Sequence, residues 1–460
     1  MKASPTSSAG QRAEKLPIST EAAFLRNSDL ESLVKEARAL YAAKRPKSAA
    51  LHAQAREVMP AGNTRSVLSY GPFPTAMSHG EDCRLRDVDG NAYLDLCGEY
   101  TAGLFGHSEP RIHAALHEAL RRGVNLAAVG EAEYRLAALL CGRFPSIERV
   151  RFTNSGTEAN LMALTIARAF TGRPAVMAFR GGYHGGVLTF PPAGESPATL
   201  PLPFVMAEYN DPEAAIAAIR AHGAELGAVL VEPMQGSGGC IPADPAFLAA
   251  LRAASSEVGA LLIFDEVMTS RMAAGGQQAR LGITPDLTTL GKYIAGGMSF
   301  GAFGGRAEVM NLIDTKLPHA GTFNNNVLSM AAGGVAMGDI FTEEVAATHF
   351  RRGEALRAEL NAICRDAAVP MHFTGLGSMM SPHFRRGPIR RAYAATSTED
   401  KLRELFFFDM LEAGIYIARR GMVALSLPVG AEDLARFSAA VSEFVESRAA
   451  ALRIAEQGDA

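Results

Sequence analysis

The sequence predicts an α/β protein built on a mostly parallel β-sheet with crossover helices. From about residue 95 onward, short apolar runs alternate with amphipathic stretches, the order of strands and helices typical of such a sheet. The chain has 460 residues, 48% of them apolar, so it can bury a large core. These two observations favour a two-part globular protein over a small binding module.

The N-terminal part of the chain is predicted to be a tail followed by two helices. Residues 1–25 are polar and rich in small side chains, which predicts a mobile tail. Helices are expected near residues 29–43 and 46–58, and the segment 59–71 is expected to form turns.

A strand, a turn and a helix follow one another in the middle of the chain. Residues 149–153 are expected to form a short strand that ends at Asn154-Ser155-Gly156-Thr157. Residues 158–170 have helical composition, and Gly172 with Pro174 just beyond it ends that helix.

A βαβ unit is predicted next. Residues 226–231 (LGAVLV) form a buried strand, residues 245–258 form a helix capped by Asp244-Pro245, and residues 260–264 (ALLIF) form the following strand. The last helix is expected to begin at Asp433. Its apolar side chains share one face: Leu434, Phe437, Val441, Phe444 and Val445.

Composition excludes several classes of function. The 45 basic and 48 acidic residues give a formal charge of -3, and the basic residues are dispersed, so no nucleic-acid-binding surface is predicted. Neither a signal peptide nor a run of roughly 18 apolar residues is present, so no membrane partner is expected. The five cysteines contain no CxxC pair, which fits a reducing cytoplasm and argues against disulfides or a zinc ribbon. Small molecules are the expected partners.

The first candidate for chemistry is an acid followed by a lysine. Asp265 and Glu266 come directly after a buried strand, where ligands bind in open α/β sheets. Lys292 lies 27 residues after Asp265 and is the only lysine between Lys47 and Lys316. A carboxylate here could hold a protonated ring nitrogen, and a lysine could form a Schiff base. Taken singly, such an acid can also cap a turn, and such a lysine can be solvated.

Two loops offer further ligand contacts. Ser155-Gly156-Thr157 opens a helix and presents free N–H groups and hydroxyls that suit a phosphate, although an ordinary N-cap is the competing interpretation. This segment matches neither GxxxxGK[ST] nor GxGxxG. In GGYHGG, Tyr183 is the candidate to stack on a flat ligand, whereas His184 is expected to be a hydrogen-bonded structural histidine. No metal-ligand spacing is present.

Six motifs in chain order resemble one enzyme family. The strings NSGTEAN, GGYHGG, VEPMQG, FDEVMTSR, PDLTTLGKYIAGGMSFGAFGG and HAGTFNNN resemble the fold-type I, class III aminotransferases that use pyridoxal 5'-phosphate. The resemblance covers about residues 45–450 and is strongest to the subgroup of aromatic β-amino-acid aminotransferases and glutamate-1-semialdehyde aminomutase. It implies a large domain over 95–345 with a mostly parallel seven-stranded sheet flanked by helices. It also implies a smaller α+β domain formed by both termini, 26–94 and 346–460.

The resemblance implies roles for individual residues. Lys292 would form the Schiff base and move the proton, and Asp265 would keep the pyridine nitrogen protonated. Ser155, Gly156 and Thr157 would bind the phosphate. The ring would be held by Tyr183 on one face, Val267 on the other, and Gln235 at its hydroxyl. Thr322 would reach the phosphate of the neighbouring subunit, which implies a homodimer with active sites at the interface.

Substrate-binding residues follow from the same subgroup. Arg65 matches the arginine that binds the substrate carboxylate, and a planar guanidinium suits that task. Arg420 resembles the arginine that receives an α-carboxylate, with Arg419 as the competing assignment.

The reaction implied is transfer of an amino group from an aromatic, β-phenylalanine-like β-amino acid to an α-keto acid, 2-oxoglutarate or pyruvate, by a ping-pong mechanism. The alternatives are a glutamate-1-semialdehyde 2,1-aminomutase and an amine or ω-transaminase of the same family. The aminomutase-type segment GTxSGNP is replaced by GTFNNNV, with Val327 at the proline position, which counts against the aminomutase. A ligand-binding protein of the same fold without catalytic activity is disfavoured because Lys292 and Asp265 are both present. A nicotinamide dehydrogenase is disfavoured because the glycine motif that binds its cofactor is absent.

Overall fold

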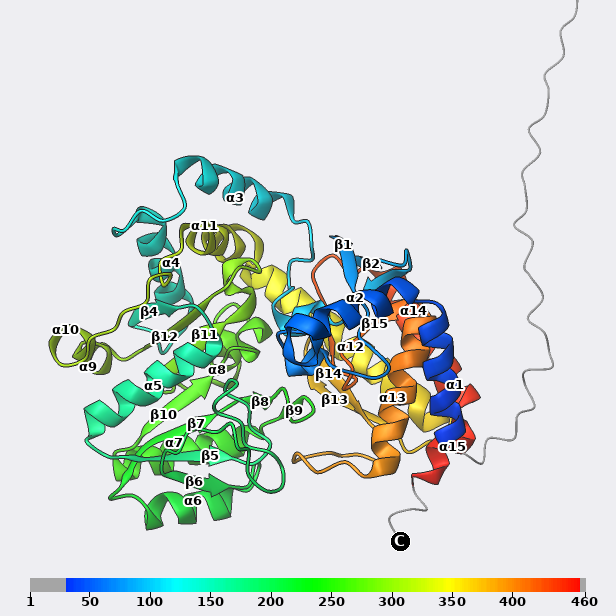
Figure 1. The fold of residues 1–460 in the computed structure, drawn as a ribbon. Helices are drawn as coiled ribbons and strands as arrows, with labels where there is room; N and C mark the ends of the chain where they lie inside the picture. Colours follow the sequence, from blue (N-terminus) through cyan, green and yellow to red (C-terminus); the bar gives the residue numbers. More distant parts are fainter. Residues whose placement is uncertain (1–29, 456–460) are drawn as a thin grey trace, which may run out of the picture.

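A computed structural model describes residues 30–455, and it has two lobes (Figure 1). The larger lobe is built on a seven-stranded sheet. The strand order is β4-β12-β11-β10-β7-β5-β6, and only β12 runs antiparallel to its neighbours. The strands are β4 (Arg149–Thr153), β5 (Ala175–Phe179), β6 (Phe204–Ala207), β7 (Leu226–Val231), β10 (Leu261–Asp265), β11 (Leu287–Gly291) and β12 (Gly301–Gly305). The predicted mostly parallel seven-stranded sheet is confirmed. The predicted tail, 1–25, lies outside the described residues.

Helices cover both faces of this sheet. Helix α5 (Gly156–Thr171) packs on one face, and α6 (Pro212–Ala221) and α7 (Pro245–Val258) pack on the other. Because strand side chains alternate between faces, Leu261 and Ile263 of β10 point to α5, while Leu262 and Phe264 point to α7. The same alternation directs Asp265, the last residue of β10, toward α5.

Both ends of the chain form the smaller lobe. One sheet has the order β1-β2-β3-β15 and another the order β13-β14-β16, so strands from before and after the large sheet pair with one another. These strands are β1 (Met77–Glu81), β2 (Arg84–Asp87), β3 (Ala92–Asp95), β13 (His372–Leu376), β14 (Met379–His383), β15 (Ile415–Tyr416) and β16 (Val423–Ala424). The helices of this lobe are α1 (Leu30–Ala43), α2 (Pro46–Val58), α12 (Glu343–Asp366), α13 (Ser397–Glu412), α14 (Ala431–Ser447) and α15 (Ala449–Ile454). A smaller α+β unit from both termini is therefore present, while the exact domain boundaries stay predictions.

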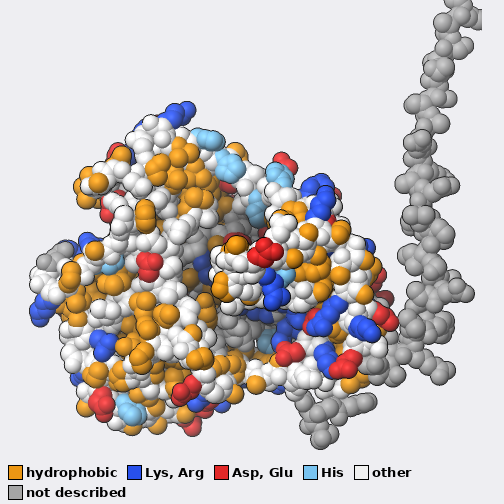
Figure 2. All heavy atoms as spheres, in the orientation of Figure 1, with side chains coloured by type: hydrophobic (Ala, Val, Ile, Leu, Met, Phe, Trp, Pro, Cys, Tyr) orange, Lys and Arg blue, Asp and Glu red, His pale blue; other side chains and the backbone are white. Residues whose placement is uncertain are grey.

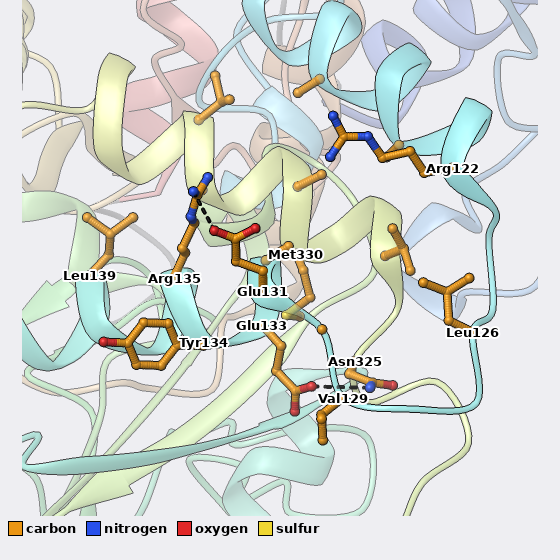
Figure 3. A pocket seen from close by; sticks show the side chains of 18 of the residues that line it. Arg122, Leu126, Val129, Glu131, Glu133, Tyr134, Arg135, Leu139, Asn325 and Met330 are labelled. Atoms are coloured by element: carbon orange, nitrogen blue, oxygen red, sulfur yellow. Dashed lines mark hydrogen bonds and ion pairs between the residues drawn. The ribbon is translucent and has the colours of Figure 1, made fainter.

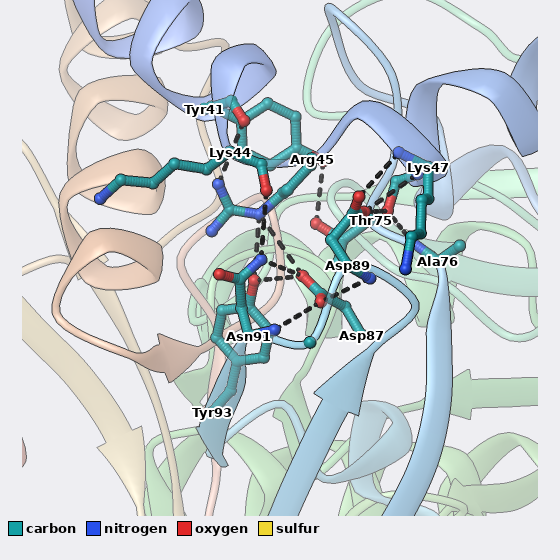
Figure 4. Close-up of polar contacts among 12 residues, drawn as sticks. Tyr41, Lys44, Arg45, Lys47, Thr75, Ala76, Asp87, Asp89, Asn91 and Tyr93 are labelled. Atoms are coloured by element: carbon teal, nitrogen blue, oxygen red, sulfur yellow. Dashed lines mark hydrogen bonds and ion pairs between the residues drawn. The ribbon is translucent and has the colours of Figure 1, made fainter.

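A buried polar cluster fastens the N-terminal helices to the small sheet (Figure 4). Arg45, at the start of α2, donates to Tyr93 Oη at 3.0 Å, and Tyr93 in turn donates to Asp87 at 2.7 Å. Asp89 accepts hydrogen bonds from the backbone N–H groups of Lys47 and Ser48 at 2.7 and 3.0 Å. A carboxylate at the first N–H groups of a helix satisfies them and complements the helix dipole, so the cluster fixes where α2 begins.

The remaining elements connect the lobes or border the large sheet. They are α3 (Pro110–Arg122), α4 (Glu131–Arg143), α8 (Gly276–Leu281), α9 (Ala307–Met310), α10 (Leu312–Thr315), α11 (Val327–Val335), the two-stranded pair β8 (Met234–Gln235) and β9 (Ile241–Pro242), and short 3-10 or π segments at Pro60–Gly62, Ser66–Leu68, Gly98–Thr101, Thr269–Met272, Lys292–Ala295 and Ala336–Ile340. No helix among residues 30–455 combines the length and the apolar character needed to cross a bilayer.

Element positions were predicted well, with small differences at the ends. Strand β10 includes Asp265, one residue further than expected, because its backbone still pairs with β11. Asp244 stands at the N-terminus of α7 as expected, but its carboxylate pairs with Arg390 and makes no capping hydrogen bond. Helix α14 begins at Ala431, two residues before Asp433, and of its predicted apolar face only Leu434 is half-buried rather than buried.

Candidate active site

The predicted site residues gather at the carboxyl edge of the large sheet. Strand β4 leads to Ser155, β10 ends at Asp265 and β11 leads to Lys292, while the segments after β5 and β7 carry Tyr183 and Gln235. Parallel strands bring their carboxyl ends to one edge, which is where open α/β sheets bind ligands. Figure 2 shows that the molecular surface is hollowed between the two lobes, with basic side chains on the walls of the hollow.

Asp265 is held by three hydrogen bonds in a buried position. Its Oδ2 accepts from Asn160 Nδ2 of α5 and pairs with His184 Nδ1, both at 2.8 Å, and its Oδ1 accepts from the backbone N–H of Val267 at 3.0 Å. Asn160 is fixed in turn by Thr289, whose hydroxyl donates to Asn160 Oδ1 at 2.8 Å. The carboxylate therefore has a fixed orientation at the end of β10.

His184 is the hydrogen-bonded histidine that was predicted, but its partner is Asp265 itself. Burial lowers the pKa of His184, whereas its hydrogen bond to Asp265 and the negative charge of that carboxylate raise it, and the net direction is upward. The pair places the His184 ring directly against the Asp265 carboxylate and so helps to hold that carboxylate in its orientation.

The N-terminus of α5 is open to an anion. Ser155 is the N-cap, and its hydroxyl accepts from the N–H of Glu158 at 3.2 Å, so the capping interpretation is confirmed for this residue. The first N–H groups of the helix remain available for an anion. Gly185 approaches so closely that a Cβ there would lie 2.3 Å from Thr157 Oγ1. Capping and phosphate binding are compatible at this site.

Val267 packs between two glycine backbones beside the lysine. A Cβ on Gly156 would lie 2.9 Å from both methyl carbons of Val267, and a Cβ on Gly291 would lie 3.3 Å from one of them. Gly291 directly precedes Lys292. The isopropyl group therefore contacts both the backbone at the start of α5 and the backbone directly before the lysine.

Gln235 and Tyr183 lie on neighbouring turns. The Gln235 amide donates to Arg180 O at 2.8 Å, while its buried Oε1 has no hydrogen-bond partner. An unpaired buried acceptor is costly, so this oxygen is suited to a donor that a ligand supplies. Tyr183 is 45% exposed and lines a cavity of about 350 Å³ together with Arg420.

Lys292 begins a tight turn with an unusual backbone. Its φ is +54°, in the left-handed region that non-glycine residues seldom adopt. Its Nζ donates to the carbonyl oxygen of Tyr100 at 2.7 Å. Burial and, next, the positive charge of Arg420 lower the lysine pKa from 10.5 to about 8. A neutral amine, the nucleophilic form, is therefore accessible near neutral pH.

Two predicted arginines lie against one aromatic ring. The Arg65 guanidinium carbon lies 5.0 Å from the centroid of the Tyr100 ring, and that of Arg420 lies 5.6 Å from it. Arg65 forms an ion pair with Glu99, whereas Arg420 donates to Ser237 Oγ at 3.4 Å and Met422 Sδ at 3.3 Å and forms no ion pair within residues 30–455. The Nε of Arg420 is buried without a partner, so this guanidinium retains binding capacity.

The structure distinguishes Arg420 from its neighbour. Arg419 forms an ion pair with Glu404 at 2.9 Å, and Glu404 also binds Arg38 from α1. Arg419 therefore belongs to the packing of the small lobe, and Arg420 faces the cavity beside Tyr183.

Thr322 lies apart from these residues. It is exposed and borders a concave surface formed by α3, α4 and α11, which encloses a volume of about 1570 Å³. It does not line the cavity beside Tyr183. Among residues 30–455 no cluster of three or more His, Cys, Asp or Glu side chains could hold a metal ion.

Sequence reasoning missed several residues of the site. Asn160 could have been suspected as a polar side chain on the buried side of an apolar helix. Glu232 is buried beside Tyr183 and Gln235, and burial raises its pKa to about 7. Nothing in the local sequence around Glu99 and Tyr100 indicates their place between the two arginines.

The chain belongs to the class-III aminotransferases, because the model of that family matches residues 67–435. It is 53% identical to β-phenylalanine transaminase from Variovorax paradoxus over 403 residues, which cover 87% of this chain and 92% of the relative. The crystal structure of a β-phenylalanine aminotransferase from Variovorax paradoxus superposes with a TM-score of 0.90 at 51% identity, covering 92% of this chain and 99% of that one. A more distant relative is glutamate-1-semialdehyde 2,1-aminomutase from Sorangium cellulosum (strain So ce56), 36% identical, with 81% of this chain and 89% of the relative covered.

Membership establishes the fold-type I architecture, the aminotransferase activity and the cofactor, pyridoxal 5'-phosphate. The residues present fit that cofactor. The unpaired Oε1 of Gln235 could accept a hydrogen bond from its ring hydroxyl, the oriented carboxylate of Asp265 could pair with its ring nitrogen, and the first N–H groups of α5 could bind its phosphate.

Proposed function

We propose that this enzyme transfers the amino group of an aromatic β-amino acid, of the β-phenylalanine type, to an α-keto acid such as 2-oxoglutarate or pyruvate, in a ping-pong sequence. The relative named β-phenylalanine transaminase supports the donor class, since it is similar over nearly the whole of both chains.

One observation carries the proposal: the guanidinium groups of Arg65 and Arg420 both lie beside the ring of Tyr100. The backbone carbonyl oxygen of the same tyrosine accepts a hydrogen bond from Lys292. Two arginines that can bind carboxylates, near one lysine that can form an imine, suit a reaction in which two carboxylic acids bind in turn. Glutamate 1-semialdehyde carries a single carboxylate, so an aminomutase has less use for both. An amine transaminase has a donor with no carboxylate at all.

The residues of the site would divide the work as follows. Pyridoxal phosphate supplies an electron sink joined to the carbon that carries the amino group. Lys292 would attach the cofactor and, once released, move a proton between the amine-bearing carbon and the cofactor. Asp265, oriented by Asn160 and His184, would hold the ring nitrogen protonated. The residues that would bind the cofactor further are Ser155, Gly156 and Thr157 at the phosphate, Tyr183 and Val267 at the ring faces and Gln235 at the ring hydroxyl.

The proposal includes a homodimer with its active sites at the interface. The concave surface of α3, α4 and α11 continues over the segment that connects α3 with α4 and carries exposed apolar side chains (Figure 3). Val129 and Leu126 of that segment are 90% and 56% exposed, and Tyr134 of α4 is 72% exposed. Exposed apolar areas of this kind mark association sites. Thr322 borders the same surface, as expected for a residue that reaches the phosphate of a second copy. Five unpaired cysteines support the proposed cytoplasmic setting.

The test is a substrate panel with the holoenzyme. β-Phenylalanine, aliphatic β-amino acids, glutamate 1-semialdehyde and 1-phenylethylamine are each supplied with and without 2-oxoglutarate or pyruvate. Turnover of the aromatic β-amino acid that requires the keto acid supports the proposal. Conversion of glutamate 1-semialdehyde without a keto acid contradicts the proposal. So does a result in which 1-phenylethylamine is the only donor of the panel that is turned over. Sedimentation analysis of Val129→Glu tests the dimer, which should dissociate and lose activity together.

A further inference from the structure

Glu232 is a buried carboxylate that contacts two different turns of the site. It follows strand β7 and is 5% exposed. Its Oε2 accepts from the backbone N–H of Tyr183 at 3.0 Å, and its Oε1 accepts from the backbone N–H of Gly236 at 3.1 Å. Gly236 directly follows Gln235. One side chain therefore bridges the segment that carries Tyr183 and the segment that carries Gln235.

Only a carboxylate satisfies both N–H groups. An ionised carboxylate has acceptor sites on both oxygens and no donor, whereas a glutamine would present an NH₂ group to one of the two N–H donors. The buried charge faces His184 and Asp265, and at longer range Lys292. Burial raises the pKa of Glu232 to about 7, while His184 and the two N–H groups favour the ionised form.

We propose that Glu232 is a positioning residue that locks the Tyr183 turn to the Gln235 turn and so fixes the two side chains that hold the cofactor ring. This inference rests on the proposed roles of Tyr183 and Gln235. The two segments leave the paired strands β5 and β7, and the Gln235 side chain also donates to Arg180 O, but Glu232 supplies the hydrogen bond that reaches the backbone of Tyr183 itself. A lock at this point keeps the stacking face and the hydroxyl partner in register before the cofactor arrives, which lowers the ordering cost of binding.

The experiment compares Glu232→Gln with Asp286→Asn. Asp286 is also buried and accepts a backbone N–H, that of Leu262 in β10 at 2.8 Å, but it directly precedes β11, at the amino end of the strands and therefore at the edge of the sheet opposite the site. The cofactor Kd is measured by reconstituting each apoenzyme with pyridoxal phosphate. We expect Glu232→Gln to raise this Kd by about tenfold or more, because one charge-assisted hydrogen bond is lost. Asp286→Asn should lower the melting temperature and leave the cofactor Kd and the visible absorption band at wild-type values.

A thermodynamic cycle shows whether Glu232 acts through its neighbours. In a Tyr183→Ala, Gln235→Ala background, adding Glu232→Gln should change the cofactor Kd by less than about twofold, because the side chains it positions are gone. An undiminished effect in that background overturns the proposal, as does a single Glu232→Gln variant with wild-type Kd and absorption spectrum.

A measurement on the wild-type protein covers the case in which the variant fails to fold. Peptides that contain the Tyr183 and Gly236 amides should be protected from hydrogen exchange in the apoenzyme as well as the holoenzyme. Free exchange at both amides in the folded apoenzyme overturns the lock. If Tyr183→Ala and Gln235→Ala themselves leave the cofactor Kd unchanged, their proposed roles fail instead, and the substrate panel tests the proposed reaction separately.

Discussion

The two arginines of the site should respond differently to removal. Arg420 has no carboxylate partner among the described residues and keeps an unpaired Nε, so a substrate carboxylate would meet a guanidinium ready to bind it. Its loss should cost about 2–3 kcal/mol, or roughly 30- to 150-fold in kcat/KM for the affected half-reaction. Arg65 is already paired with Glu99, and both side chains are largely exposed, at 41% and 57%.

The pair with Glu99 reduces what Arg65 can contribute. A substrate carboxylate must share Arg65 with Glu99 or displace it, and an exposed ion pair of this kind is worth about 0–1 kcal/mol. Arg65→Ala should therefore cost about 1–2 kcal/mol, or roughly 5- to 30-fold. The expected order is that Arg420→Ala impairs the α-keto acid half-reaction more than Arg65→Ala impairs the β-amino acid half-reaction.

Stopped-flow absorbance separates the two half-reactions. The pyridoxal form of each variant is mixed with β-phenylalanine, and the pyridoxamine form with 2-oxoglutarate or pyruvate. Arg419→Ala is the matched control, because the neighbouring arginine binds Glu404 and should change neither half-reaction by more than about threefold. Equal losses in both half-reactions from either variant, or a loss from Arg419→Ala as large as that from Arg420→Ala, would refute the reasoning.

Three further predictions concern the lysine and its acid. Lys292→Ala should still bind the cofactor non-covalently but lose nearly all turnover, and a steady-state rate within about tenfold of wild type contradicts the assignment. Asp265→Asn should retain cofactor better than turnover, since it keeps the size but removes the charge; the reverse pattern, no cofactor bound but normal rates in the residual holoenzyme, argues against it. Because the Lys292 pKa is lowered to about 8, the rate of covalent cofactor capture by the apoenzyme should rise with pH through about 8, and Arg420→Gln should move that midpoint upward. A wild-type midpoint near 10.5 rules this out.

The site residues at the carboxyl edge of the large sheet could be predicted because their positions depend on local sequence patterns. Apolar runs locate the strands, and the rule that ligands bind at strand carboxyl ends then selects Ser155, Asp265 and Lys292. The structure brings these residues together as expected, and the alternation along β10 explains why Asp265 meets Asn160 of α5. Thr322 lies on a separate surface, and its role across subunits stays a prediction.

The substrate side could not be predicted in the same way, because it depends on contacts between distant segments. Arg65 and Glu99 are 34 residues apart, and Lys292 meets Tyr100 across 192 residues. The choice between Arg419 and Arg420 depends on which of two successive side chains faces Glu404, a residue of α13 that no motif connects to them. The bridge by Glu232 depends on two backbone N–H groups, which no side-chain pattern reveals.

Backbone strain links these distant contacts. Gly98, Glu99, Tyr100 and Thr101 all have positive φ, between +46° and +81°. Each non-glycine residue in that region costs about 1–2 kcal/mol, so the segment persists only where its surroundings hold it in place. The surroundings hold this segment through four contacts. The Tyr100 carbonyl oxygen accepts from Lys292, and the Tyr100 ring lies beside both arginines. Glu99 pairs with Arg65, and the buried guanidinium of Arg271 donates to Thr101 O at 3.5 Å. This one short turn thus contacts Lys292 and both arginines, so a substitution that relaxes it should disturb cofactor attachment and, if the proposed roles of the arginines hold, substrate binding together.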